Sequence, residues 1–369
     1  MHKISRREFL KTLLRAAGAL ALNPLLSGCT PQKESILVEN SPAPCLEETP
    51  CNPQGGPSTQ TSVPPGSQPE AQNTQAPDSS VSITQSTEAP SAPTSEPALP
   101  TQGIPDLSVA RGGEPEELVR RAILALGGME RFVSRGNHVI IKPNLCTGYY
   151  SYEYAATTNP WVVGALIRIC LEAGAGNVQV MDFPFGGSAQ QVYQRVGMKD
   201  EVEAAGGEMV VMSPIKYVKT PIPDGKSIQE WDLYDDILKA DVVINVPIAK
   251  HHGLARLTLG MKNLMGVVLD REGLHRDLGQ RIADITSVVR PALTVIDAVR
   301  ILTNNGPTGG SLDDVQKLDT IIASPDIVAA DSYATSLFNW KPEDIAYIQA
   351  GAAMRLGVSD LSTLTIADV

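Results

Sequence analysis

Short apolar runs alternate with longer amphipathic segments through residues 104–369. Four runs, at 138–142, 178–181, 242–246 and 293–296, are typical of strands that are buried on both faces of a parallel sheet. The segments between such runs carry apolar residues at helical spacing. The alternation predicts an α/β fold in which a mainly parallel sheet is flanked by helices in a single large domain.

The remaining elements follow from the same periodicity and from the positions of Gly and Pro. Further strands are predicted at 208–212, at 217–223 as an edge strand, and at 320–323. Helices are predicted at 115–126, 161–173, 190–205, 281–289, 327–338 and 343–356. Segment 229–239 is ambiguous between helix and strand, and 258–268 is either a helix or irregular.

The stretch 241–275 is the one around which the domain is organised. Pro247 is expected to end the strand at 242–246 because it has no N–H to donate. The loop expected after it is rich in polar residues: Lys250, His251, His252, Thr258, Lys262, Asn263, Arg271 and His275. Ligands of open α/β sheets sit beyond the carboxyl ends of the strands, so we interpret this loop as part of an active or binding site. The alternative for any single Lys or His is a solvated loop residue.

Polar residues also follow three other predicted strands. Lys142 and Asn144 come after the first, Asp182 after the second and Asp297 after the last. Each Asp could instead cap a helix or a turn. The turn 306–310, which contains Gly309 and Gly310, could present backbone N–H groups to an anion. No Walker sequence is present and no GxGxxG follows a strand, so nucleotide binding has little support.

Charge is distributed unevenly along the chain, whose net charge is −11. Residues 1–29 carry about +4 and residues 30–103 about −7, which leaves about −8 for 104–369. A domain this acidic is a poor candidate for sequence-independent binding to nucleic acid, and no nucleic-acid partner is expected. An anion site would therefore be a local basic pocket.

Cysteine and histidine limit the metals that the domain could hold. Residues 104–369 contain only Cys146 and Cys170, too few for an iron–sulfur cluster held by four cysteines. Cys146 follows a strand and is a site candidate, whereas Cys170 lies on the apolar side of a helix. A divalent metal held by His252 or His251, His275 and a carboxylate, Asp182 or Asp297, would be chemically reasonable. The spacing matches no known ligand signature, so the cofactor stays open.

The first 29 residues have the features of an export signal. Ser5-Arg6-Arg7-Glu8-Phe9-Leu10-Lys11 resembles the twin-arginine motif, and an apolar stretch follows at 13–26. Leu26-Ser27-Gly28-Cys29 resembles a lipobox in which Cys29 takes the lipid. These resemblances imply a bacterial lipoprotein that uses the twin-arginine export machinery and is anchored to the outer face of the cytoplasmic membrane.

Residues 30–103 are rich in Pro, Ser, Thr, Gln and Ala. Such a segment buries too little apolar surface to offset the entropy of ordering it, so it is expected to be a disordered linker. Cys45 and Cys51 lie in it, and a local disulfide, a metal site or no role are all compatible with the sequence.

Several motifs together resemble the DUF362 family, a domain of unknown function. They occur in order and cover nearly all of 104–369: IIKPN at 140–144, AGA at 173–175, VINVP at 243–247 with Lys250-x-His252, TLGMKNLMG at 258–266, Arg271, His275, Asp297-Ala298 and GPTGG at 306–310. The KNLMG segment is the most specific. The family's recurrent polar positions correspond here to Lys142, Asn144, Lys250, His252, Lys262, Asn263, His275 and Asp297. Some relatives carry ferredoxin-like Cys motifs, which this chain lacks.

Two functional hypotheses remain. In the first, the domain is an enzyme with a metal- or anion-assisted site for a small anionic substrate. The expected catalytic residues are His252, His275, Lys250 and Lys262. The expected substrate-binding residues are Lys142, Asn144, Asn263, Arg271, Gly309 and Gly310, and the expected metal ligands are His252, His275, Asp182 and Asp297. In the second, the same basic cluster captures a small anion or cofactor without catalysis.

Overall fold

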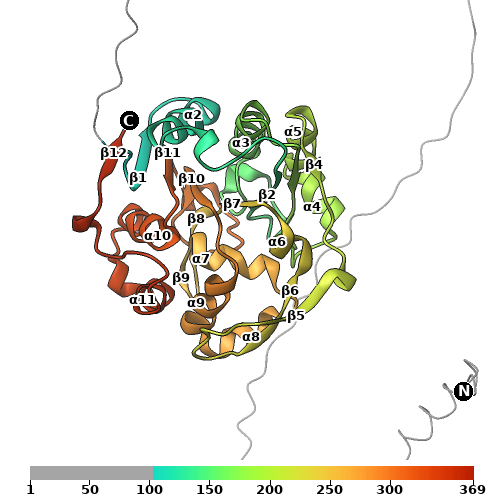
Figure 1. Ribbon diagram of the computed structural model, residues 1–369, viewed down its shortest axis with the longest axis vertical. Helices are drawn as coiled ribbons and strands as arrows, with labels where there is room; N and C mark the ends of the chain where they lie inside the picture. Colours follow the sequence, from blue (N-terminus) through green and yellow to red (C-terminus); the bar gives the residue numbers. More distant parts are fainter. Residues whose placement is uncertain (1–102) are drawn as a thin grey trace, which may run out of the picture. The chain divides into compact units, whose positions relative to one another are not determined.

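The computed structural model describes residues 103–369, and Figure 1 shows their arrangement. The predicted export signal, the predicted lipidation site Cys29, the predicted linker up to 102 and the pair Cys45 and Cys51 lie outside the described residues. Within 103–369, no helix is long and apolar enough to cross a membrane.

Twelve strands are formed in the part of the chain that the structure describes. They are β1 (Leu107–Arg111), β2 (His138–Pro143), β3 (Asn177–Val180), β4 (Glu208–Met209), β5 (Tyr217–Pro221), β6 (Glu230–Tyr234), β7 (Val242–Val246), β8 (Ile248–His252), β9 (Arg256–Thr258), β10 (Leu293–Leu302), β11 (Val315–Ser324) and β12 (Ile366–Asp368).

The α-helices of the same region differ widely in length. They are α2 (Pro115–Ala125), α3 (Pro160–Glu172), α4 (Ala189–Arg195), α5 (Met198–Ala204), α6 (Asp235–Lys239), α7 (Gly260–Asn263), α8 (Arg271–Leu274), α9 (Leu278–Val288), α10 (Ile327–Thr335) and α11 (Ala346–Ala353). Short 3₁₀ turns connect several of them, including η4 (Leu264–Val267) directly after α7.

The main sheet runs in the order β12-β1-β11-β10-β7-β2-β3-β4, and β8 pairs with both β10 and β9. Its centre and one side, β10-β7-β2-β3-β4, are parallel. The pairs β1–β11, β10–β11 and β8–β9 are antiparallel. The predicted class, a mainly parallel sheet flanked by helices, is confirmed.

Helices cover both faces of this sheet because its central strands are apolar on both sides (Figure 1). Val139 and Ile141 of β2 pack into a core cluster with α2, α3, α4 and α5. Ile140, between them, packs into a second cluster with α7, α9, α10 and α11. The same alternation repeats in β7, where Ile244 faces the first cluster and Val243 the second.

Pro247 ends β7 as predicted, but the expectation that a loop follows it is wrong. Pro247 interrupts the ladder for one residue only, and its carbonyl accepts the Asp297 N–H at 2.9 Å. Because β10 is ten residues long, it continues past the end of β7 and pairs with β8 as well. Lys250, His251 and His252 therefore lie on a strand rather than in a loop.

Other predicted bounds are also wrong. The helix expected at 190–205 is divided into α4 and α5, because Gly197 between them has a φ of 74°, which a helix interior does not accommodate. Segment 229–239 contains both elements, β6 and then α6. The strand expected at 217–223 pairs as β5 with β6 in a separate hairpin rather than at the edge of the sheet.

Three further differences concern strands of the main sheet. The strands expected at 293–296 and 320–323 are parts of β10 and β11, which are longer than predicted and pair with each other in antiparallel fashion. The strand expected at 208–212 is reduced to two residues in β4, which pairs with β3 alone. Neither β1 nor β12 was predicted; β1 pairs with β11, and β12 pairs with β1 at the edge of the sheet.

Candidate functional site

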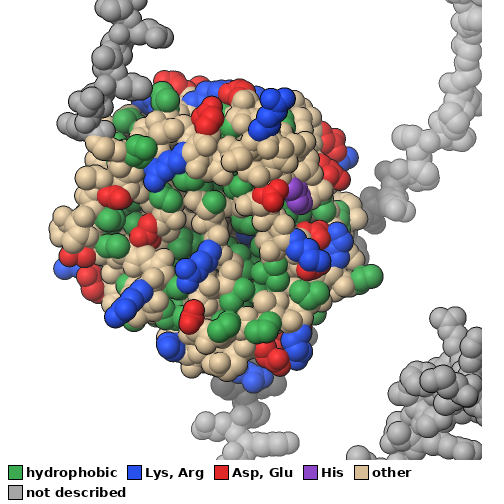
Figure 2. All heavy atoms as spheres, viewed as in Figure 1, with side chains coloured by type: hydrophobic (Ala, Val, Ile, Leu, Met, Phe, Trp, Pro, Cys, Tyr) green, Lys and Arg blue, Asp and Glu red, His purple; other side chains and the backbone are tan. Residues whose placement is uncertain are grey.

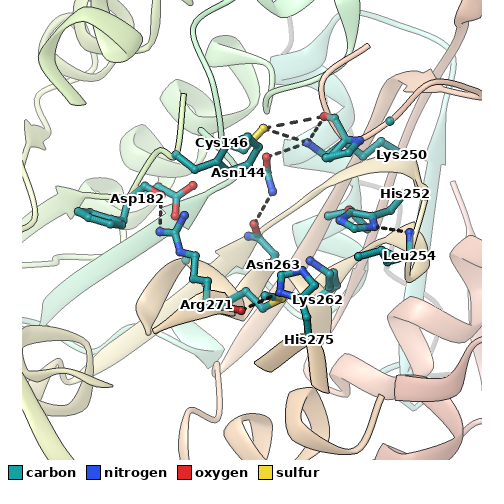
Figure 3. Close-up of a pocket in the computed structure, with 18 of the residues that line it drawn as sticks. Asn144, Cys146, Asp182, Lys250, His252, Leu254, Lys262, Asn263, Arg271 and His275 are labelled. Carbon is teal, nitrogen blue, oxygen red and sulfur yellow. Dashed lines mark hydrogen bonds between the residues drawn. The ribbon is translucent and has the colours of Figure 1, made fainter. Parts of the chain in front are cut away.

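A cavity of about 510 Å³ opens where β2, β3 and β7 end. Its wall is formed by the β8–β9 hairpin, α7, α8, and the segments after β2, β3 and β10. Figure 2 shows that the domain is hollowed near the middle of this face and that hydrophobic side chains border the hollow. Figure 3 shows Asn144, Cys146 and Lys250 on one side of the cavity and Lys262, Arg271 and His275 on the other.

Most of the residues that the sequence singles out line this cavity. They are Lys142, Asn144, Cys146, Asp182, Lys250, His252, Thr258, Lys262, Asn263, Arg271 and His275. Asp297, Gly309 and Gly310 do not line it. His251 also lies off the cavity, and its Nδ1 accepts the Gly306 N–H at 3.1 Å.

Asp297 lies outside the cavity, and its hydrogen bonds stabilise the fold. It lies inside β10, and its carboxylate accepts the N–H groups of Asn159 at 2.7 Å and Val299 at 3.0 Å. Complete burial raises its pKa to about 6. The expectation that it ligates a metal or orients a histidine of the cavity is wrong, because it ties the loop before α3 to the sheet.

The glycine turn reaches the cavity with its first residues only. Gly306 and Pro307 line the wall, and the Pro307 carbonyl accepts a hydrogen bond from Lys250. Gly309 instead lies against Leu302, and Gly310 faces the hydroxyl of Tyr150. The prediction that Gly309 and Gly310 contact the substrate is therefore at odds with their positions.

Lys142 and Asp182 form a buried ion pair at the base of the cavity. The Lys142 Nζ lies 2.7 Å from Asp182 Oδ1, and the other carboxylate oxygen accepts the Leu145 N–H at 2.6 Å. Burial lowers the pKa of Lys142, and the charge of Asp182 opposes that shift. Because a buried ammonium is costly unless it is paired, Asp182 compensates Lys142 and is engaged within the protein.

Three asparagines connect this pair to the neighbouring elements. The Asn263 carbonyl oxygen accepts from Lys142 Nζ at 3.2 Å and from Asn144 Nδ2 at 2.9 Å. Its amide nitrogen donates to Asn245 Oδ1 at 2.9 Å. Strands β2 and β7 and helix α7 are thus joined by one polar network, which fixes the orientation of the cavity wall.

Lys250 is held by three oxygens and one sulfur. Its Nζ donates to the carbonyls of Ala156 at 2.6 Å and Pro307 at 2.9 Å, and to Asn144 Oδ1 at 3.1 Å. The Cys146 Sγ lies 3.2 Å away. These contacts place a positive charge in the wall without a carboxylate partner.

Lys262 differs from both other lysines. Its side chain is 8% exposed, and none of residues 103–369 supplies a hydrogen-bond acceptor for its Nζ. Burial lowers its pKa to about 7, and the nearby charges of Lys250, Arg271 and Lys142 contribute further. Both the amine and the ammonium are therefore populated near neutral pH.

The short helix α7 holds Lys262 in place through a carboxylate of α10. Asp331 accepts the N–H groups of Gly260 at 2.6 Å and Met261 at 2.8 Å. A Cβ at Gly260 would lie 2.7 Å from Asp331 Oδ1. A Cβ at Gly266 would overlap Asp182 Oδ1 and lie 2.5 Å from the Nζ of the paired lysine. The two glycines of the TLGMKNLMG segment are thus required by close contacts.

His252 is a neutral hydrogen-bond donor. Its Nδ1 accepts the backbone N–H groups of Leu254 and Ala255, both at 3.2 Å, so the ring proton resides on Nε2. Burial lowers its pKa to about 3, and Lys262 and Lys250 add to the effect. With its proton on Nε2, the ring has no lone pair to offer to a metal or to a substrate proton.

His275 has the opposite tautomer. Its Nδ1 lies 2.8 Å from the carbonyl oxygen of Arg271, which can only accept, so Nδ1 donates. The lone pair of the neutral ring is therefore on Nε2. Among the histidines that line the cavity, His275 is the one that can accept a proton.

Arg271 and Thr258 add hydrogen-bond donors that the described residues pair only in part. The Arg271 guanidinium lies over the Phe183 ring at 4.8 Å and donates to the Phe183 carbonyl. Its Nε and the Thr258 Oγ1 are buried and have no hydrogen-bond partner in the described region. The wall therefore offers more donors than the protein itself satisfies.

The expected metal ligands are not assembled. In residues 103–369 no group of three or more His, Cys, Asp or Glu side chains is arranged to hold a metal ion. Asp182 is paired with Lys142, Asp297 is outside the cavity, and His252 has no free lone pair. The set His252, His275, Asp182 and Asp297 does not fit a metal site.

Fold and site together define an α/β domain with a cationic cavity at the ends of its central strands. The family model described as Domain of unknown function (DUF362) matches residues 139–336, more than half of the chain. The chain belongs to this family, as its motifs predict.

A relative and two solved structures resemble the chain. A thylakoid-associated protein of Synechocystis sp. is 30% identical over 250 residues, which cover 65% of this chain and 74% of that protein. Lactate racemase apoprotein from Thermoanaerobacterium thermosaccharolyticum and a protein from Thermotoga maritima each cover 62% of this chain with a TM-score of 0.40, at 14% and 12% identity. The chain spans 56% and 60% of those two structures, less than two thirds of either.

Sequence reasoning missed the apolar part of the wall. Phe183, Phe185, Leu254 and Met265 line the cavity beside the charged residues. Two of them were signalled by the sequence, because Phe183 directly follows Asp182 and Met265 lies in the TLGMKNLMG motif. Asp331, which positions α7, gave no signal because it lies far along the chain in a helix.

Replacing Lys262 by methionine should stabilise the protein. The fold disfavours the ammonium of Lys262, and each unit of pKa shift corresponds to about 1.4 kcal/mol, so a gain on the order of 2 kcal/mol or more in free energy of unfolding is expected. The pKa is about 7 in the fold and 10.5 in an unperturbed lysine. The gain should be largest below pH 7 and shrink as pH rises from 7 towards 10.5.

Urea unfolding of the two proteins at about pH 6, 8 and 10 measures this difference. Lys199→Met, at a half-exposed lysine of α5, is the control and should show no such trend. A Lys262→Met variant that is less stable than the wild type at every pH would contradict the assignment of Lys262 as a buried, unpaired amine.

Proposed function

We propose that this domain is an enzyme that binds a small anionic substrate in the cavity and transfers a proton to or from it. The observation that carries the proposal is Lys262, whose side chain is nearly buried in the cavity wall and whose amine has no acceptor among residues 103–369. A group of this kind destabilises the fold and is retained where it serves a ligand.

The charge of the wall supports an anionic ligand. Besides the paired Lys142, the cations Lys250, Lys262 and Arg271 line the cavity and have no ion-pair partner in the described chain. Glu272 also lines it but is exposed, so solvent screens its charge. An anion between these cations would remove their mutual repulsion in a medium of low dielectric constant.

The protonation states of the wall support proton transfer. Lys262, with a pKa of about 7, can give or take a proton near neutral pH. His275 presents a lone pair on Nε2 and is oriented by the Arg271 carbonyl. His252 presents a fixed N–H, which can stabilise an oxygen of the substrate as negative charge develops on it. An acid, a base and a neutral donor are thus available around one cavity.

Solvent exchange tests this proposal directly. A panel of small 2-oxo carboxylates would be incubated with the protein in D₂O. The protein should catalyse exchange of the C–H proton next to the carbonyl of one or more of them, and NMR would follow the exchange. His275→Ala and Lys262→Met should each slow exchange by about 100-fold or more, the usual contribution of a general acid or base. Lys199→Met, outside the cavity, should exchange at the wild-type rate.

If the carboxylates of the panel bind but none of them exchanges its proton, the result would contradict the proposal of an enzyme. It would favour the alternative, a protein that only captures anions. Wild-type exchange in both cavity variants would show that these two side chains do not carry the proton.

We further propose that the chain is exported and anchored by lipid at Cys29. Support comes from the twin-arginine-like and lipobox-like sequences of the first 29 residues. The relative in Synechocystis sp. is described as thylakoid-associated, which is compatible with a membrane location. The acidic, Pro-rich segment 30–103 would be long enough as a flexible chain to keep the domain clear of the membrane surface.

Replacement of Cys29 tests the anchor. The wild type expressed in bacteria should incorporate labelled palmitate and sediment with membranes, and Cys29→Ser should lose the label and appear in the soluble exported fraction. Cys45→Ser is the matched control and should behave like the wild type. An unlabelled wild type, or a Cys29→Ser variant that stays with the membrane, would contradict lipid anchoring.

A further inference from the structure

The cavity is chemically divided between its base and its mouth. At the base, the side chains of Lys142, Lys250 and Lys262 are almost completely buried. At the mouth, the apolar side chains of Phe185 and Leu254 are 56% and 73% exposed. Three lysines therefore lie deep and two apolar side chains lie near solvent, where the exposed Glu272 and His275 also line the cavity.

The base has an excess of hydrogen-bond donors. The Lys262 Nζ, the Arg271 Nε and the Thr258 Oγ1 have no partner in the described residues, and the His252 Nε2–H faces the same space. Buried donors of this kind require acceptors. A ligand that satisfies them is rich in acceptor oxygens, as an oxyanion is.

The wall also has an apolar part. Phe183, Met265 and Pro307 line the cavity between base and mouth, together with the two exposed side chains. Met265 is 7% exposed and has a flexible side chain that adapts to different shapes. A volume of about 510 Å³ falls in the range of cavities that hold drug-sized ligands and is far larger than an oxyanion alone.

We propose that the ligand is an amphipathic organic anion, with its oxyanion group on Lys262, Arg271 and Thr258 and an apolar chain or ring against Met265, Leu254 and Phe185. The apolar part shields the buried charges from water and strengthens their attraction to the anion. This inference rests on the proposed function and adds the chemical class of the substrate.

A series of straight-chain carboxylates tests the charged end and the apolar end of the ligand separately. Calorimetry would use the full chain carrying Cys29→Ser, so that no lipid or detergent is present, and would compare acetate, butyrate and hexanoate. Each added methylene should lower Kd about threefold to fourfold, as expected for burial of about 0.8 kcal/mol per CH₂. Hexanol, which lacks the charge, should not bind detectably.

Variants assign the effect to the two ends. Leu254→Ala and Phe185→Ala should flatten the dependence on chain length and leave the Kd of acetate unchanged, because both side chains are at the mouth. Lys262→Met should weaken every carboxylate by the same factor. Leu312→Ala, an exposed leucine that does not line the cavity, is the matched control and should reproduce the wild-type series.

The possible results distinguish a failure of the amphipathic class from a failure of the anion site. Equal Kd values for acetate and hexanoate would overturn the amphipathic class and leave the anion site standing. A normal length dependence in both mouth variants would overturn the placement of the apolar part. No binding of any carboxylate would overturn the anion site as well.

Discussion

The burial of three lysines in one wall is the constraint on which the rest of the site depends. The fold satisfies Lys142 with the carboxylate of Asp182 and Lys250 with backbone carbonyls and an asparagine. Residues 103–369 provide no acceptor for the amine of Lys262. The Lys262 amine, the Arg271 Nε and the Thr258 Oγ1 are therefore left without a partner among the described residues, and the cavity lies where a ligand could supply one.

The surrounding structure can be understood as support for this arrangement. Asn263 links β2, β7 and α7, and Asp331 of α10 fixes the start of α7. The tight approach of Gly266 to the Lys142–Asp182 pair explains why a glycine ends the most specific motif of the family. Burial of Lys262 lowers the free energy of unfolding, and the hydrogen-bond network around it raises that free energy, as is common at functional sites.

The sequence predicted much of the fold because parallel strands buried on both faces are marked by continuous apolar runs, as in β2 and β7. It also predicted which residues meet, because polar groups after such strands gather at one edge of the sheet. It failed for β8, whose pairing depends on the length of a distant strand, and for Asp297, whose partners come from another loop. The tautomers of His252 and His275 depend on backbone groups that only the folded chain brings close.

The most direct test of the account is the titration of Lys262 itself. NMR of protein with ¹³C-labelled lysine, assigned with Lys262→Met, follows the protonation of this one amine. The account predicts a midpoint near pH 7 that moves upward when a carboxylate binds, because the anion stabilises the ammonium. A midpoint near 10.5, the value of an unperturbed lysine, would contradict the claim that Lys262 is buried without a partner.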